Sequence, residues 1–184
     1  MVELRFLSFT FTFTFTFATG LRERNVVELA WEQVDLEQHR AWVHVDQAKG
    51  RQRAIAVPLN AQAMVVLREQ QGQHPTRVFV YEGEPVTRAN NHAWRKALRR
   101  AGIENLRWHD LRHTWASWHV QAGTPLNVLQ ELGGWATLEM VLRYAHLGAD
   151  HLAEHAERIA SSRVIRTNSG TAIKNTLPKS LAGY

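Results

Sequence analysis

Hydrophobic and polar residues follow two different periods along this chain, and the period changes near residue 19. From Phe9 to Phe17 every second residue is phenylalanine, and threonines fill the positions between them. A period of two predicts a β-strand, because alternate side chains of a strand point to opposite faces. The tract carries no charge and no proline, so an exposed strand of this kind would be prone to aggregate. We interpret residues 1–18 as a low-complexity segment foreign to the domain that follows, as a frame error or a truncated gene would produce.

From Thr19 onward the pattern is that of a folded domain, with a small sheet followed by helices. Alternating stretches on either side of Lys49-Gly50 predict a β-hairpin. Elsewhere, apolar residues three and four positions apart predict helices, and capping residues mark their ends. The predicted elements are a helix over 23–30, hairpin strands over 41–46 and 53–58, a helix over 61–71 capped by Asn60, a strand over 77–81, a helix over 87–101 capped by Thr87, and helices over 110–122, 124–134, 137–146 and 149–160. The expected fold class is mainly α with a small antiparallel β-sheet (α+β).

The composition excludes several classes of protein. The chain has 184 residues, of which 45% are hydrophobic and 21% are charged, as in an ordinary globular domain. It contains no cysteine, which excludes disulfides, thiol nucleophiles and cysteine-bound metals. No apolar run reaches the roughly 18 residues of a membrane-spanning helix.

Most of the net charge of +5 lies in the last part of the chain. Residues 161–184 hold four basic and no acidic residues, and we interpret them as a basic, flexible tail. The rest of the chain is nearly balanced, so a DNA-binding surface needs a local cluster of positive charge. The helix predicted over 87–101 supplies one. Its basic residues, beside or opposite the apolar face, are Arg88, Arg95, Lys96, Arg99 and Arg100.

Two segments could carry chemistry, and each also has a plainer explanation. His109 and Arg112 are three residues apart at a helix start, so they share a face. A proton-moving histidine and a forked arginine at a helix N-terminus indicate a phosphate site; the alternative is a capped helix with surface charges. Tyr144 lies about 110° from the apolar centre of its helix, at 100° per residue. Its phenol could face a cleft, or it could be a boundary tyrosine with a wet hydroxyl.

Three further features are weaker still when taken alone. Arg22 follows Thr19-Gly20-Leu21 at a turn into a helix, and Lys49 lies at the hairpin tip; both could be plain surface residues. The histidines at 109 and 113 are four apart, as are those at 151 and 155, and such pairs can hold zinc. No acidic third ligand stands at a diagnostic spacing, so we expect no metal site.

The order and spacing of these features resemble the tyrosine recombinase (phage integrase) family. The motifs are Thr-Gly-Leu-Arg ending at Arg22, a hairpin lysine at 49, His-x-x-Arg at 109–112, Leu-Gly-Gly-Trp ending at Trp135, and Tyr144. Arg22 and Lys49 are 27 residues apart, Arg112 and Trp135 are 23 apart, and Trp135 and Tyr144 are 9 apart. The resemblance covers residues 19–147.

The resemblance implies a catalytic domain over 19–160 that cuts and rejoins DNA through a 3′-phosphotyrosine bond. The implied site residues are Tyr144 as the nucleophile, Arg22 and Arg112 as clamps on the phosphate oxygens, Lys49 as the general acid, His109 in proton transfer, and Trp135 where the family has His or Trp. Two arginines and a lysine can neutralise the charge of a phosphoryl group without a metal, so no cofactor is implied.

The resemblance also implies partners. Double-stranded DNA is the expected substrate, and the basic residues of the helix over 87–101 would contact its backbone. The chain is expected to form a homo-oligomer on DNA, away from any membrane, in the cytoplasm of a bacterium or a phage-infected host.

Two departures from the family pattern leave other readings open. Asn25 stands where the family usually has an acidic residue, and the Phe-Thr tract occupies the place of helices upstream of Thr19. We also expect no N-terminal core-binding domain, and therefore weaker affinity and specificity for DNA. The alternatives are a truncated, catalytically silent DNA-binding remnant, a type IB-like topoisomerase, and a zinc hydrolase built on His109 and His113.

Overall fold

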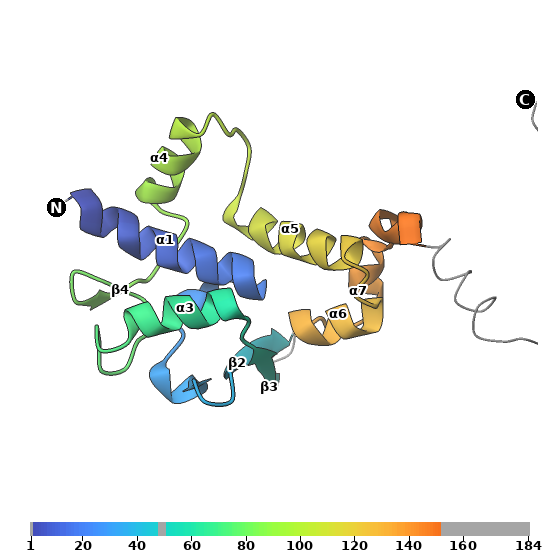
Figure 1. Cartoon of the computed structure of the whole chain (residues 1–184), viewed down its shortest axis with the longest axis horizontal. Helices are drawn as coiled ribbons and strands as arrows, with labels where there is room; N and C mark the ends of the chain where they lie inside the picture. The colour runs from blue at the N-terminus through green and yellow to red at the C-terminus, as the bar shows by residue number, and fades with distance from the viewer. Residues whose placement is uncertain (1, 48–50, 152–184) are drawn as a thin grey trace, which may run out of the picture. The chain divides into compact units, whose positions relative to one another are not determined.

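The chain begins with a long helix rather than the strand that the alternating tract predicts. The structure, a computed structural model, describes residues 2–47 and 51–151 (Figure 1). Helix α1 (Val2–Thr19) covers the whole Phe-Thr tract, so the strand prediction is wrong. The interpretation of residues 1–18 as foreign concerns their origin and stays a prediction. Side chains from Phe11 to Ala18 nevertheless pack in the core with the sheet and the other helices.

The tract is helical because several of its faces are buried at once. Phe15 is fully buried with its ring 5.3 Å from that of Phe79, while Phe13 packs 6.0 Å from Trp94, on another side of the helix. The buried Thr16 is satisfied within the helix, since its hydroxyl donates to the carbonyl of Thr12 at 2.7 Å. A helix surrounded by protein need not be amphipathic, so the period of two gave the wrong element.

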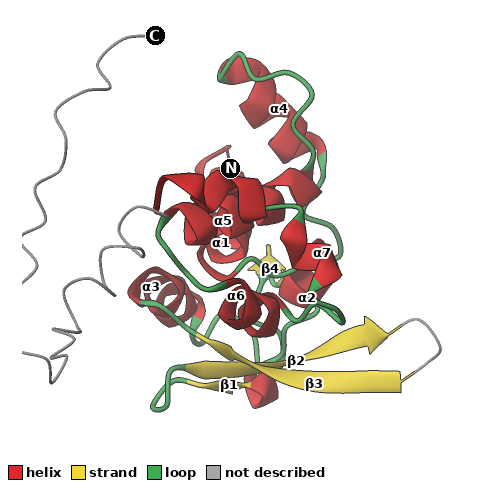
Figure 2. Ribbon diagram, turned by 90° about the vertical axis from the view of Figure 1, so that its right-hand side faces the viewer, coloured by secondary structure: helices red, strands yellow, loops and turns green. Residues whose placement is uncertain are grey.

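The predicted hairpin is confirmed. Strands β2 (Arg40–Gln47) and β3 (Arg51–Pro58) pair antiparallel, and β1 (Val34–Asp35) extends the sheet in the order β1-β2-β3 (Figure 2). Ala41, paired with Val57, and Val43 turn inward and are buried. The turn over 48–50 lies outside the described residues, and Lys49 with it.

The sheet joins α1, α2 (Glu23–Val27) and α3 (Ala61–Gln70) in one core. Asn60 caps α3 as predicted, because its side chain accepts from the Ala63 N–H at 2.9 Å. The same side chain donates to the Ala18 carbonyl at 3.0 Å. One residue therefore ends α1 and begins α3.

Two predicted elements are shorter because residues 29–31 pair with residues 76–78. The Trp31 N–H donates to the Thr76 carbonyl at 2.9 Å, and the Val78 N–H donates to the Leu29 carbonyl at 3.0 Å. This pairing stops α2 at Val27, where the sequence predicts a helix to 30. A short 3-10 helix, η1 (Trp31–Gln33), follows. The strand predicted over 77–81 is reduced to β4 (Val80–Tyr81), which pairs with β5 (Glu84–Pro85).

The remaining helices are α4 (His92–Arg100), α5 (Trp108–Gln121), α6 (Leu126–Gly133) and α7 (Glu139–Leu142), followed by the 3-10 helix η2 (Ala145–His151). Thr87 was the wrong cap for α4, since Asn91 accepts from the N–H groups of Ala93 and Trp94. The helix predicted over 149–160 extends beyond the described residues, and the tail over 161–184 lies outside them. The expected fold class is confirmed: the described chain is mostly helical with small antiparallel sheets. None of its described helices is long and apolar enough to cross a membrane.

Candidate active site

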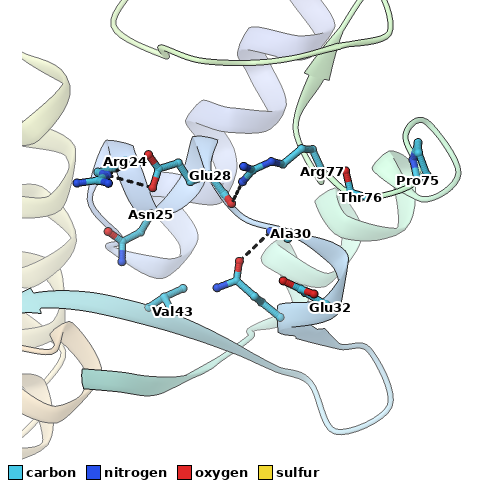
Figure 3. Close-up of a pocket in the computed structure, with 10 residues that line it drawn as sticks. Arg24, Asn25, Glu28, Ala30, Glu32, Val43, Pro75, Thr76 and Arg77 are labelled. Atoms are coloured by element: carbon cyan, nitrogen blue, oxygen red, sulfur yellow. Dashed lines mark hydrogen bonds and ion pairs between the residues drawn. The ribbon is translucent and has the colours of Figure 1, made fainter. Parts of the chain in front are cut away.

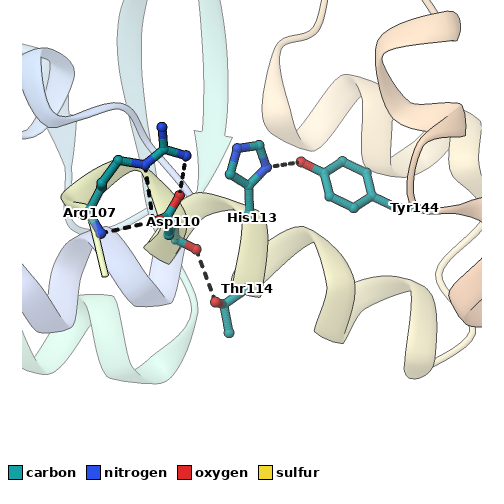
Figure 4. A network of polar contacts seen from close by, with 5 residues as sticks. All are labelled: Arg107, Asp110, His113, Thr114 and Tyr144. Atoms are coloured by element: carbon teal, nitrogen blue, oxygen red, sulfur yellow. Dashed lines mark hydrogen bonds and ion pairs between the residues drawn. The ribbon is translucent and has the colours of Figure 1, made fainter. Parts of the chain in front are cut away.

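The start of α5 positions the polar residues of the site. Asp110 fixes this start, because its carboxylate accepts from the Arg107 backbone N–H and from the Arg107 guanidinium, both at 2.8 Å (Figure 4). Leu111 and Trp115 are buried on one side of the helix. His109 is exposed and His113 is half-buried, and their rings meet edge to face with centroids 4.9 Å apart.

Arg112 is almost completely buried and ties together two distant loops. One terminal nitrogen donates to the Gly20 carbonyl and the other to the Gly133 carbonyl, each at 2.6 Å. The guanidinium carbon lies 4.1 Å from the centroid of the Trp135 ring. Burial, followed by the positive charge of Arg22, lowers the pKa of Arg112 to about 10, so it stays charged at neutral pH. The Thr-Gly-Leu-Arg and Leu-Gly-Gly-Trp motifs therefore meet at this side chain.

Two glycines make that close approach possible. A Cβ added to Gly20, which has a φ of +65°, would lie 2.3 Å from the Trp115 ring. A Cβ added to Gly133 would lie 1.9 Å from the Trp135 ring. Both distances are far inside van der Waals contact, so glycine is required at each position for the packing around Arg112.

Tyr144 lies between α7 and η2, in a stretch of three-residue turns. Its N–H donates to the Val141 carbonyl, and its own carbonyl accepts from the Leu147 N–H. The sequence predicts one regular helix over 137–146 with Tyr144 on its flank. In the tighter 3-10 geometry, residues three apart lie one above the other, so Tyr144 is turned inward with Val141. Only 6% of Tyr144 is exposed.

The Tyr144 hydroxyl points at His113, as Figure 4 shows. The distance from Oη to the His113 Nδ1 is 2.6 Å. Burial raises the pKa of Tyr144 despite the nearby charges of Arg143 and Arg112. The pKa values of His109 and His113 are both lowered, in each case chiefly by burial. At neutral pH, a protonated phenol therefore faces a neutral imidazole.

The only role that the sequence indicated for His113 was the zinc alternative. Its position directly after Arg112, and one helical turn from His109, is a usable signal, since such a residue lies near the same face. Within the described ranges, no group of three or more possible metal ligands is found.

Arg22 lies at the start of α2 and reaches the same cluster. With Arg88, Trp108 and His109 it lines an open pocket of about 430 Å³. Its positive charge lowers the pKa of both Arg112 and His109. Glu23, the next residue, also lines the pocket and accepts from the N–H groups of the loop before α4, at 2.8 Å from Ala89 and 2.7 Å from Asn90.

The structure thus gathers most of the predicted site. The positive charge of Arg22 acts on both His109 and Arg112. The Arg112 guanidinium lies over the Trp135 ring, whose centroid is 6.1 Å from that of the Tyr144 ring. Arg88 lies at the pocket, while the other predicted DNA-binding residues are exposed along α4 and do not line it. The members of that second set are Arg95, Lys96, Arg99 and Arg100.

A second pocket, of about 660 Å³, shares Arg24 and Glu28 with the first but is otherwise lined by other residues (Figure 3). Its lining contains both positive and negative side chains, and several of them already have partners. Arg24 forms an ion pair with Glu28 at 2.9 Å, and Arg77 donates to the Glu28 carbonyl. Asn25, where the family usually has an acidic residue, also lines this pocket. None of the described catalytic candidates lines it, so it is a poor candidate for the phosphate site.

Comparison with known proteins finds integrases and site-specific recombinases. The model of the phage integrase family matches residues 4–151, which include the Phe-Thr tract. An integrase of Salmonella phage P22 is 52% identical over 157 residues, which are 78% of this chain and 40% of the relative. A shufflon-specific DNA recombinase of Escherichia coli is 33% identical over 71% of this chain and 33% of its own length. The chain therefore spans less than half the length of these relatives.

Solved structures agree on the fold. The catalytic domain of bacteriophage HP1 integrase has a TM-score of 0.57 at 26% identity, and the match covers 80% of this chain and 79% of that one. The Tn1549 transposon integrase has a TM-score of 0.67 at 18% identity, over 85% of this chain and 63% of that one. With a family match over most of its length and this shared fold, the chain belongs to the phage integrase family of tyrosine recombinases.

Proposed function

We propose that this chain is the catalytic domain of a site-specific DNA recombinase that cuts and rejoins double-stranded DNA through a 3′-phosphotyrosine bond. One observation carries the proposal: a buried tyrosine hydroxyl meets the polar face of α5, 31 residues earlier in the sequence, beside a buried arginine. A phenol held in this way among cations suits attack on a phosphodiester better than it suits a structural tyrosine.

Tyr144 supplies the nucleophile. Attack by its Oη on phosphorus forms a phosphotyrosine bond and releases a 5′-hydroxyl, so the energy of the phosphodiester is kept for rejoining. The reaction then needs no nucleotide cofactor. It also needs no metal, provided that side chains neutralise the phosphate.

Arg22 and Arg112 supply that neutralisation, and His109 assists proton transfer beside them. Arg112 keeps N–H groups beyond the two that bind Gly20 and Gly133, because a guanidinium has five donors in a planar fork. Arg22 and His109 line the neighbouring pocket. Charges fixed in place before the reaction lower the barrier because they need not reorganise.

Lys49 is assigned as the general acid for the leaving 5′-oxygen. The register of β2 and β3 runs to the pair Gln47–Arg51, so the two strands form a paired arm up to these residues, and Lys49 lies between them in the sequence. A lysine on such an arm can reach a DNA groove. This assignment comes from the family pattern.

Double-stranded DNA is the proposed partner. The Tn1549 integrase was solved in complex with a circular intermediate DNA, and the recombinase of Escherichia coli is named for DNA recombination. Arg88 at the pocket and the four basic residues of α4 would contact the phosphate backbone. We also propose that copies of the chain assemble on the DNA in the cytoplasm of a bacterial host.

Covalent trapping tests the proposal. The purified chain is mixed with a pool of nicked duplexes of random sequence, denatured in detergent, and examined for DNA that stays attached. We expect attachment by the wild type and none by Tyr144→Phe, which loses one hydroxyl and should still bind DNA. Sequencing of the attached DNA then gives a defined substrate. Failure to attach by a chain that melts cooperatively would favour the silent remnant, and relaxation of supercoils by single protomers would favour the topoisomerase.

A further inference from the structure

We propose that His113 is a catalytic residue of this site, whose Nδ1 holds the phenol of Tyr144 for attack and receives the phenol proton. The inference rests on the proposed function, in which Tyr144 is the nucleophile. It gives the attacking oxygen a named proton acceptor, separate from the groups that clamp the phosphate and protonate the leaving oxygen.

The geometry of the pair supports this role. Nδ1 and Oη are 2.6 Å apart, and the two rings are tilted by 44° with centroids 6.0 Å apart (Figure 4). His113 comes from the second turn of α5, whereas Tyr144 follows α7, so the hydrogen bond is a tertiary contact. A proton acceptor must lie within about 2.6–3.2 Å of the proton donor, and this pair meets that condition before DNA is bound.

The surroundings of His113 keep its ring neutral. The charged and titratable groups that face it are His109, Asp110 and Arg112 on α5, Arg107 just before that helix, and Arg143 beside Tyr144. Asp110 favours the protonated ring, but its carboxylate is engaged by Arg107. Burial and the arginines act the other way, and the pKa of His113 is lowered. In the neutral ring, Nδ1 accepts from the phenol only when the ring proton lies on Nε2.

Every proton that moves in the step is taken up or supplied by a side chain of the site. The Oη–P bond forms as the P–O5′ bond breaks, the phenol proton passes to Nδ1, and the general acid gives a proton to O5′. In rejoining, the 5′-hydroxyl attacks phosphorus and returns its proton to the general acid, while the imidazolium protonates the departing Oη. No oxidant, metal or other reactant is required.

The test separates the attacking side from the leaving side of the reaction. The defined nicked duplex is made with either oxygen or sulfur as the 5′-bridging atom, because a thiolate leaves without being protonated. We expect His113→Ala to slow attachment by about a hundredfold or more on both substrates, the usual size of a proton-transfer contribution. Lys49→Ala should be slow with oxygen and restored by sulfur. His119→Gln is the matched control, since His119 lies on the same helix and contacts the hydroxyl of Thr124, at 3.0 Å; its rate should equal that of the wild type.

The pH profile adds a readout that a purely structural role would leave unchanged. With the sulfur substrate, the wild-type rate should fall as the pH drops through the lowered pKa of His113 and should be level above it. His113→Asn keeps an acceptor oxygen near the phenol but cannot take its proton. Its rate should lack the plateau and rise into the alkaline range as Tyr144 ionises. This variant also covers the case in which His113→Ala fails to fold.

Several results would overturn the inference. If the sulfur substrate restored the rate of His113→Ala, His113 would act on the leaving 5′-oxygen rather than on the phenol. A wild-type rate and pH profile in His113→Asn would remove it from the proton path. In both cases the wild type still attaches to DNA, whereas loss of attachment in the wild type itself would count against the proposed function instead.

Discussion

The guanidinium of Arg112 lies over the ring of Trp135, with 4.1 Å between the guanidinium carbon and the ring centroid. Its two terminal nitrogens bind the carbonyls of Gly20 and Gly133. The backbone just before Arg22 and the backbone just before Trp135 are therefore held by the same side chain. An arginine assigned to the phosphate is also the residue that sets the distance between two motifs of the site.

The substitution Arg112→Lys should distinguish the effect of the positive charge at this position from that of the forked guanidinium. Lysine keeps the positive charge but cannot bind two carbonyls in a fork or stack on an indole in the same way. We expect a loss of about 2 kcal/mol in unfolding free energy, the size of one buried hydrogen bond from a charged donor, measured by urea denaturation. Attachment to nicked DNA should fall by about a hundredfold or more, as after loss of a preorganised donor. A drop under tenfold would argue that charge alone matters at this position.

Gly20 and Gly102 form a matched pair for the packing around this arginine. Their φ angles are +65° and +64°, but a Cβ at Gly20 would meet the Trp115 ring whereas a Cβ at Gly102 would meet nothing within 4 Å. Gly102→Ala should cost only the backbone strain, about 1–2 kcal/mol. Gly20→Ala should cost about 1–3 kcal/mol more because of overpacking. Equal losses in urea denaturation would mean that Trp115 moves aside freely.

Local signals in the sequence predicted local structure well. The hairpin of β2 and β3 and the Asn60 cap depend on residues close in sequence, and both are confirmed. The α1 tract failed because its helix is decided by distant partners such as Phe79 and Trp94, which period counting does not see. The His113–Tyr144 contact joins residues 31 apart and depends on the 3-10 turns around Tyr144, so spacing alone could not give it. The catalytic roles carried over from the family pattern stay predictions.

The burial of α1 predicts that its phenylalanines stabilise the domain. Phe15 is fully buried against Phe79, so Phe15→Ala should lower the unfolding free energy by about 3–5 kcal/mol. Val65 on α3 is 59% exposed, and Val65→Ala should change it by no more than about 0.5 kcal/mol. Urea denaturation of both variants checks this. A small effect at Phe15 would show that the tract does not contribute to the core.

Stability should fall on mild acidification. Burial holds the pKa values of His109, His113 and His119 below their ordinary value of 6.5. The unfolded chain therefore binds more protons than the folded chain in this range, so the stabilisation is complete above pH 6.5 and is lost as the pH falls through the lowered pKa values. Unfolding free energies measured between about pH 7.5 and pH 5 should decrease. His119→Gln should flatten the slope, and an unchanged slope would exclude His119 as a contributor.

For a substitution of Glu23, simple electrostatics and the observed geometry predict opposite changes in DNA affinity. Its carboxylate oxygen accepts from the N–H groups of Ala89 and Asn90 and so holds the loop that carries Arg88 and leads into α4. If charge alone governed DNA binding, Glu23→Ala would strengthen it, because a negative charge disappears near the DNA surface. We expect the variant to bind more weakly, with a shallower dependence of affinity on salt, because Arg88 and the α4 basic residues lose their fixed position and fewer phosphates are neutralised together.

The control for this prediction is the exposed Glu104, which follows α4 and makes no contact of this kind in the described part of the chain. Glu104→Ala should strengthen binding slightly, as simple loss of a negative charge requires. Titration of a nonspecific duplex at several salt concentrations compares the two variants directly. Stronger binding by both would reduce Glu23 to a surface charge, whereas opposite shifts would establish it as the residue that positions the basic surface against the catalytic pocket.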